Sequence, residues 1–298
     1  MIRLVLFSLF FINHSVSADK LNMGAVDGCA AYPPFIRKIG MQQPVAIDTA
    51  GLDRPGLKLR EVRSGGRSYQ KYGWSITGHA GATVRDRFGN IYVIPVPSVS
   101  LDTNPLEKRN IIYKVNAQNG EIAEFLRLPL PKENTQNNPF GTLGLAIDCE
   151  TNSLYVSTVA GSTPNKVSGS IYQISLETAR VISKVEGIDA VGIAVFNFTD
   201  KKVLMYGDAR SSSLYSLRLL RNGNFSKLAK PKYELSLLEI KNATSTQIKK
   251  IRFVKDDNQN HIMVLTDAEF AYRLIAETRQ QSKKYYFEWN EKLGKWIN

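Results

Sequence analysis

Apolar and polar positions repeat along the chain in a pattern of short, paired strands. Residues 81–93 and 144–156, which begin 63 positions apart, align without a gap. Each has an apolar stretch, a polar turn and a second apolar stretch that ends in Tyr and Val. A third stretch, apolar-Tyr-x-apolar, follows at residues 112–115 and 171–174, and each copy then turns into a fourth. Short strands joined by turns, recurring at tens of residues, indicate a repeat architecture.

Two further copies continue the pattern. The third spans residues 192–225, and the fourth predicts strands at 251–254, 261–265 and 270–274. A last hairpin, at 285–289 and 295–297, is placed to complete that unit or the next one. Four short antiparallel strands make one propeller blade. We therefore expect an all-β fold, with residues 19–298 forming a single β-propeller domain of four-stranded antiparallel blades.

The number of blades follows from the length of the chain. At about 40–50 residues per blade, the 280 residues from 19 onward predict six blades, with five as the alternative. Propellers usually close their ring by borrowing a strand from the opposite end, which gives the N-terminal segment a structural role. A helical protein is disfavoured because no dozen residues keep a 3.6-residue apolar period. The internal repetition disfavours a β-sandwich.

Residues 1–18 have the pattern of a secretory signal peptide. A charged start precedes an apolar run at residues 4–12, and the small Ala18 provides a cleavage site. A membrane anchor is the alternative, but the run is shorter than the roughly 20 residues that a span needs. No later segment is apolar enough to cross a bilayer. We expect a secreted or periplasmic protein.

The chain carries a net charge of +12, and removing residues 1–18 takes away one Arg and no acid, leaving +11. The excess is dense in residues 54–71 and 249–255. A basic secreted protein tends to meet anionic surfaces such as acidic polysaccharide. The alternative is a solvated strand face. Because no nucleic-acid-binding module is recognisable, we expect no nucleic acid partner.

Two cysteines, Cys29 and Cys149, remain after residue 18. In an oxidising compartment they could form one disulfide that pins the N-terminal segment to the repeat carrying Cys149. Two buried free thiols are the alternative. With only three His in the chain, one of them before residue 18, a multi-His zinc site is excluded.

The repeat resembles the blade of six-bladed propellers of the NHL, gluconolactonase/regucalcin, strictosidine-synthase-like and major royal jelly (yellow) group. The resemblance covers residues 76–275, is closest at 191–217, and concerns the blade instead of an active site. Gluconolactonase-like enzymes hold a divalent cation on the propeller axis, partly through an Asp after a second strand. The resemblance thus implies Asp208 and Asp267 as ligands of a cation such as Ca²⁺. The family's Asn before the inner strand and its early Glu have no match here.

In a propeller, residues before each inner strand and after each second strand converge on the central channel. The alignment places six residues there: His79, Thr142, Thr158, Asp189, Asp208 and Asp267. Carboxylates around one opening could bind a hard cation, with His79 as a base or orienting group. The alternative for the Asp residues is turn formation, and a lone His is more often structural.

Three functions compete. The first is a propeller that binds a small molecule or protein ligand at its central face without catalysis. The second is a metal-dependent hydrolase of the lactonase or esterase type, and the third is adhesion to an anionic surface. No phosphate-binding Gly-rich loop, GxSxG, HExxH or EF-hand motif occurs. Whether the protein is an enzyme is therefore left open, and the binding function is preferred.

Overall fold

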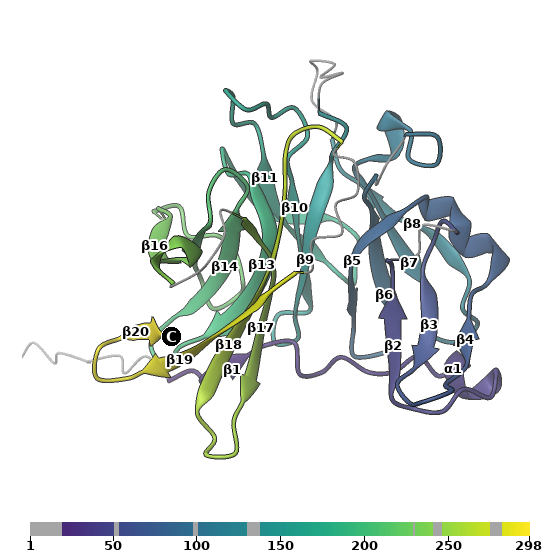
Figure 1. Cartoon of the computed structure of the whole chain (residues 1–298), viewed down its shortest axis with the longest axis horizontal. Helices are drawn as coiled ribbons and strands as arrows, with labels where there is room; N and C mark the ends of the chain where they lie inside the picture. The colour runs from purple at the N-terminus through teal and green to yellow at the C-terminus, as the bar shows by residue number, and fades with distance from the viewer. Residues whose placement is uncertain are drawn as a thin grey trace, which may run out of the picture.

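The computed structural model describes residues 20–50, 54–97, 101–129, 138–228, 230–240, 246–274 and 282–298. Five antiparallel sheets stand side by side around a central space (Figure 1). The predicted signal peptide lies outside the described residues. Among the helices of the described ranges, none has the length and apolar character needed to cross a membrane.

Each sheet is one blade, with strands in chain order from the centre outward. The first blade has three strands, β2 (Val45–Asp48), β3 (Lys58–Glu61) and β4 (Ser68–Tyr69). The second has β5 (Ala80–Arg85), β6 (Ile91–Pro95), β7 (Ile111–Val115) and β8 (Ile122–Arg127). The third has β9 (Thr142–Asp148), β10 (Ser153–Thr158), β11 (Ser170–Ser175) and β12 (Val181–Glu186).

The last two blades follow the same plan. The fourth contains β13 (Ala190–Asn197), β14 (Lys202–Asp208), β15 (Ser213–Leu219) and β16 (Lys232–Ser236). The fifth contains β17 (Gln247–Lys255), β18 (His261–Ala268), β19 (Lys284–Asn290) and β20 (Lys295–Ile297). The remaining elements are short: β1 (Gly24–Ala25), α1 (Phe35–Lys38), and the 3₁₀ turns η1 (Tyr72–Thr77), η2 (Leu106–Lys108) and η3 (Leu237–Glu239).

The propeller fold and the four-stranded antiparallel blade are confirmed, but the prediction of six blades is wrong. The structure has five, the alternative considered from the sequence. Residues 270–274, expected to be a third strand, form no strand. Instead β19 and β20 become the third and fourth strands of the fifth blade. The last hairpin therefore belongs to the fifth blade, and the described residues contain no further strands for a sixth.

Buried apolar clusters join consecutive blades. Trp74 belongs to the cluster between blades 1 and 2, Leu154 to that between 2 and 3, Leu204 to that between 3 and 4, and Phe196 to that between 4 and 5. Burial of such side chains contributes about 25 cal/mol per Å² of apolar surface. Within the described ranges, no such cluster joins blade 5 to blade 1. β17–β18 and β2 stand apart in Figure 1, so among the described residues apolar packing does not close the ring on this side.

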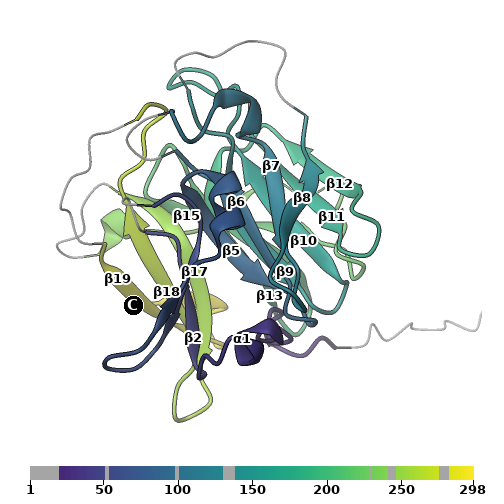
Figure 2. The same ribbon diagram turned by 90° about the vertical axis from the view of Figure 1, so that its right-hand side faces the viewer.

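The N-terminal segment runs along one end of the blades, where α1 lies (Figure 2). β1 pairs with β13 of the fourth blade. Cys29 then forms the predicted disulfide with Cys149, in the turn after β9. Further on, Ala31 N–H donates to Asp86 O at 3.0 Å in the second blade. The predicted disulfide, which pins this segment to the blade that carries Cys149, is confirmed. The expectation that the segment closes the ring is wrong, because β1 joins the centre of blade 4.

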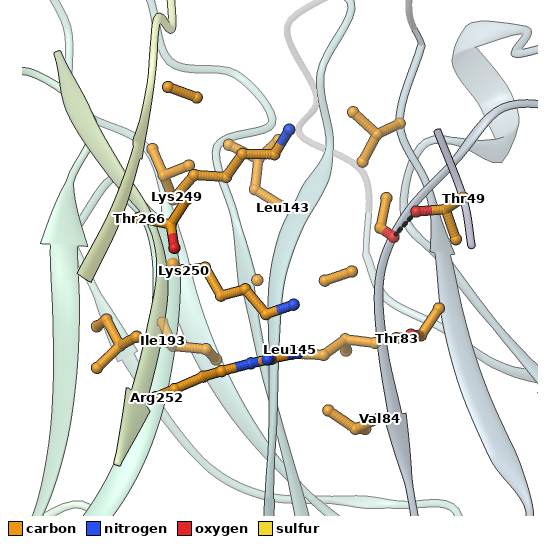
Figure 3. Close-up of a pocket in the computed structure, with 18 of the residues that line it drawn as sticks. Thr49, Thr83, Val84, Leu143, Leu145, Ile193, Lys249, Lys250, Arg252 and Thr266 are labelled. Carbon is orange, nitrogen blue, oxygen red and sulfur yellow. Dashed lines mark hydrogen bonds between the residues drawn. The ribbon is translucent and has the colours of Figure 1, made fainter. Parts of the chain in front are cut away.

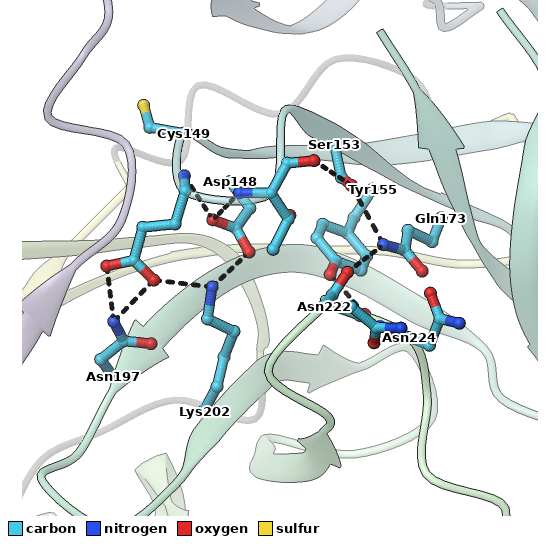
Figure 4. Close-up of polar contacts among 12 residues, drawn as sticks. Asp148, Cys149, Ser153, Tyr155, Gln173, Asn197, Lys202, Asn222 and Asn224 are labelled. Carbon is cyan, nitrogen blue, oxygen red and sulfur yellow. Dashed lines mark hydrogen bonds and ion pairs between the residues drawn. The ribbon is translucent and has the colours of Figure 1, made fainter. Parts of the chain in front are cut away.

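A buried cation fixes the turn that carries Cys149. Lys202 of β14 donates to Asp148 Oδ2 at 2.6 Å and lies 2.8 Å from Glu150 Oε2 (Figure 4). Asn197 also donates to the Glu150 carboxylate. Although partial burial opposes it, these hydrogen bonds lower the pKa of Glu150 below its ordinary value. The third and fourth blades are thus linked by charge as well as by apolar packing.

Candidate ligand-binding cavity

A cavity of about 1130 Å³ occupies the centre of the ring. The wall includes residues from the inner strands of all five blades, β2, β5, β9, β13 and β17, together with residues 266–271 and Arg273. Apolar side chains such as Leu143, Leu145 and Ile193 form part of the lining (Figure 3). Hydroxyl groups of Thr49, Thr83 and Thr266 add neutral polar groups. Mostly apolar walls with a few polar groups are usual for ligand sites.

The inner strands of blades 2 to 5 share a β-bulge. In each, the inner strand has one more residue than the second strand opposite it. A bulge of this kind re-aims neighbouring side chains and bends the strand. Aligning the bulges makes four residue pairs equivalent: Gly81–Ala82, Leu143–Gly144, Val191–Gly192 and Lys249–Lys250. In blades 2 to 4 these positions are small or apolar, and in blade 5 both are lysine.

The glycines at these bulges allow neighbouring inner strands to approach. A Cβ atom on Gly144 would lie 2.6 Å from Val191 O, and one on Gly192 would lie 2.6 Å from Lys249 O. Lys250 is the equivalent of Gly192 in the last blade. Since no described strand packs on this side of β17, there is room for a long side chain at that position. It projects into the cavity instead (Figure 3).

Three cations of β17 face the cavity. Lys249, Lys250 and Arg252 are exposed and line it, and none has a salt-bridge partner among the described residues. The surrounding protein removes part of the hydration of Lys250, which lowers its pKa, and the nearby charges of Arg252, Lys249 and Lys284 lower it further. A bound anion would relieve this repulsion. The cavity wall also includes acids, Asp27, Asp267 and Glu269.

Two of the four predicted site residues line the cavity, His79 and Asp267. The backbone N–H of His79 donates to Asn104 Oδ1 at 2.8 Å, and its carbonyl accepts from Asn104 Nδ2 at 2.9 Å. Asp267 is buried: its Oδ1 accepts from Lys283 N at 2.6 Å, and its Oδ2 accepts from the hydroxyls of Thr246 and Tyr285.

Asp189 serves the structure of the loops. Its buried carboxylate accepts from Ser162 Oγ at 2.6 Å and from Gly169 N at 2.9 Å on one oxygen. The other oxygen accepts from Tyr272 OH at 2.6 Å and from the Arg210 guanidinium at 2.9 Å. These bonds hold three separate segments together, and Asp189 is not part of the cavity wall. Tyr272 and Arg210 were missed from the sequence, because their partner lies far away in the chain.

Asp208 and Asp267 hold equivalent places, as the alignment predicted. Asp208 pairs with Ala190 at the start of β13, and Asp267 pairs with Ile248 near the start of β17. Burial raises the pKa of Asp208, while its hydrogen bond with Ser211 Oγ, at 2.6 Å, opposes the rise. The negative charge of Asp189 adds to the rise in the pKa of Asp208.

The predicted divalent cation needs a further ligand. In the part of the chain that the structure describes, no three His, Cys, Asp or Glu side chains gather closely enough to hold a metal ion. Both oxygens of Asp267 are already used by protein donors. Among the described residues, Asp208 and Asp267 thus have no third ligand of these types, and their role as metal ligands stays a prediction.

The cavity cations were recognised in the sequence as a basic stretch but not as part of a site. The signal available was the repeat itself: aligning β17 with β13 places Lys249 and Lys250 on Val191 and Gly192. The fourth copy lacks the glycine that marks the inner strand in the others. This made the alignment too loose to use before the register was known.

No protein-family model matches the chain, and no curated protein matches it. Similar solved structures include an endo-arabinase from Bacteroides thetaiotaomicron VPI-5482, with 13% identity, a TM-score of 0.40, and 70% of this chain and 74% of that chain covered. A streptogramin B lyase has 12% identity and a TM-score of 0.34, covering 89% and 73%. A glucose dehydrogenase has 11% identity and a TM-score of 0.39, covering 80% and 77%. Membership in the NHL, gluconolactonase-like or yellow-like group stays a prediction.

Proposed function

We propose that the protein binds an anionic ligand in its central cavity and does not act on it chemically. The observation that carries this proposal is the row Lys249, Lys250 and Arg252, which faces a cavity of about 1130 Å³ without ion-pair partners in the described ranges. Arg binds carboxylate or phosphate through two parallel hydrogen bonds, and Lys supplies a point charge. The row therefore suits a carboxylated or phosphorylated ligand.

Secretion or export to the periplasm is part of the proposal. The leader-like pattern of residues 1–18 supports it, and so does the disulfide Cys29–Cys149, because disulfides persist mainly in oxidising compartments. An anionic saccharide is a ligand that such a protein would meet there. The neutral hydroxyls of Thr83 and Thr266 would complement its hydroxyl groups.

Calorimetric titration tests the proposal with a trimer of galacturonic acid as the probe and a neutral galactose trimer as its control. We expect binding of the acidic trimer only, and a loss of about tenfold or more in affinity in the Lys250→Gln/Arg252→Gln double variant. Lys227→Gln, an exposed cation outside the cavity, should bind like the wild type. If the double variant bound the acidic trimer with wild-type affinity, the proposal would be refuted.

A metal-dependent hydrolase remains the second candidate because Asp208 and Asp267 occupy equivalent places in adjacent blades. Calorimetry with Ca²⁺, Mg²⁺, Mn²⁺ and Zn²⁺ tests it. Binding of one ion that disappears in Asp208→Asn, together with hydrolysis of a lactone, would favour this function. Absence of binding for all four ions would remove it.

A further inference from the structure

In the part of the chain that the structure describes, no blade packs on one face of the fifth blade. Strand pairing places Lys250, Thr266 and Lys284 in one row across β17, β18 and β19, and Arg252, Val264 and Tyr286 in the next. All six side chains are exposed or half-buried. The opposite face, with Leu265 and Phe287, packs on blade 4.

The equivalent face in the other blades is buried. Val264 corresponds to Met205 in blade 4 and to Tyr155 in blade 3, each of which is completely buried against the next blade. The exposure of the row that contains Val264 therefore follows from the open side of the ring, not from the blade itself.

The first blade presents a face with two cations, Lys58 and Arg60, and one acid, Asp48, toward the same side of the ring. Val45 and Leu59 pack toward blade 2, whereas the cross-strand pairs Ala46–Arg60 and Asp48–Lys58 occupy the other face of the sheet. Arg60 is exposed, and neither Arg60 nor Lys58 has an ion-pair partner in the described ranges. Ala46 lines the central cavity, so this face continues the cavity wall outward.

The two basic stretches noted in the sequence thus flank one opening. Part of the first stretch is neutralised, because Glu61 pairs with Arg63 and Arg67, and Lys71 pairs with Glu121. Arg60 and Lys58 are left facing the opening. Two faces of like charge repel each other, and a second copy of the same surface would be repelled for the same reason. An anionic occupant is the one that complements both sides.

We propose that a linear acidic polysaccharide occupies this opening, with its uronate carboxylates contacting Lys250, Arg252 and Lys284 on one side and Arg60 on the other. This inference rests on the proposed function and names its ligand class. The cavity volume of about 1130 Å³ exceeds the roughly 300–1,000 Å³ of sites for single small molecules, and among the described residues no apolar cluster closes the ring between blades 5 and 1. A chain therefore enters from the side and extends beyond the central space.

Single-stranded nucleic acid suits the opening less well. Proteins that bind it combine cations with several aromatic side chains on which successive bases stack. Tyr286 is the single aromatic residue in the two rows of blade 5 described above. Uronate chains need charge and hydroxyl contacts, and Thr266 in the same row supplies a hydroxyl.

Titration with galacturonate oligomers tests the inference, using the trimer and the hexamer. Arg60→Gln should weaken hexamer binding by about threefold to fivefold, the range of an exposed ion pair, and leave trimer binding unchanged. Lys284→Gln should weaken hexamer binding to a similar degree and also alter trimer binding, because the charge of Lys284 acts on Lys250. Lys227→Gln serves as the matched control. Thermal unfolding of each variant shows that the fold is kept, which is expected because both side chains are exposed.

The outcomes separate the two proposals. If trimer binding depends on Lys250 and Arg252 while hexamer affinity is the same in the wild type and in the Arg60 and Lys284 variants, the polysaccharide inference fails and the proposed function stands. If neither oligomer depends on Lys250 and Arg252, both fail. Tighter binding of a thymidine hexanucleotide than of the galacturonate hexamer, through the same residues, would overturn the choice of polysaccharide.

Discussion

Gly192 of β13 lies against the backbone of Lys249 on β17, where an added Cβ would be 2.6 Å from the carbonyl oxygen. This contact joins the last two blades and sets the position from which Lys249 and Lys250 reach the cavity. The absence of a side chain in blade 4 is thus a condition for the cationic row in blade 5.

Replacing Gly192 by Ala should destabilise the protein by about 1–3 kcal/mol, because the two inner strands must separate. Gly73→Ala is the control, since a Cβ there meets no atom within 4 Å, and its effect should stay within about 0.5 kcal/mol. Urea unfolding measures both. Equal stabilities of the two variants would contradict the contact.

Lys250→Met should make the protein more stable while it weakens anion binding. Burial and three neighbouring cations lower the pKa of Lys250, so the charged form is less favourable in the fold than in the unfolded chain. Removing the charge should raise Tm by about 1–3 °C at low salt, and less at high salt because the repulsion is screened. A lower Tm for Lys250→Met would show that the lysine is stabilised by contacts instead.

Removing the disulfide should lower the free energy of unfolding by more than any single surface substitution does. The bond Cys29–Cys149 joins residues 120 positions apart, and on the chain-entropy model a loop of this size contributes about 4–5 kcal/mol. We expect the Cys29→Ser/Cys149→Ser variant to unfold at a correspondingly lower urea concentration. Reduction of the wild type should give the same shift. An unchanged midpoint would mean that the N-terminal segment is held by its other contacts.

Asp189→Asn should destabilise the fold by about 3–5 kcal/mol, because it removes the charge that pairs with Arg210 in a buried network. The exposed Asp200→Asn is the matched control and should change little. Thermal unfolding compares the two. If Asp189→Asn keeps its stability but loses ligand binding, Asp189 has a functional role that its hydrogen bonds do not suggest.

Glu61 should make the protein sensitive to acid. Backbone N–H groups of Gln42 and Arg67 and the Arg63 side chain lower its pKa from 4.5 to about 2. A carboxyl group whose pKa is lower in the folded state stabilises the fold at pH values above its pKa in the unfolded chain. For Glu61 this stabilisation is lost as the pH falls from 4.5 toward 2. The Tm of the wild type should exceed that of Glu61→Gln at pH 6, and the difference should vanish near pH 2. A Tm difference between the wild type and Glu61→Gln that did not change with pH would contradict the lowered pKa of Glu61. The control is Glu177→Gln, at an exposed position.

The sequence by itself determined the blade. The overlay of residues 81–93 on 144–156 predicted β5–β6 and β9–β10, because alternating side chains and Asp- or Asn-rich turns act over a few residues. The pairing of Cys29 with Cys149 was also within reach, since two cysteines allow one bridge. The equivalence of Asp208 and Asp267 followed from the same alignment.

Only the tertiary structure decided the number of blades and the site. Whether residues 285–297 complete one blade or begin another depends on which strand they pair with, and pairing with β18 is a long-range choice. The exposure of Lys250 and Arg252 depends on the side of the ring between blades 5 and 1, where no blade formed by the described residues covers them. A basic stretch looks the same in sequence whether it faces bulk solvent or a cavity, because neighbours from distant segments determine what surrounds it.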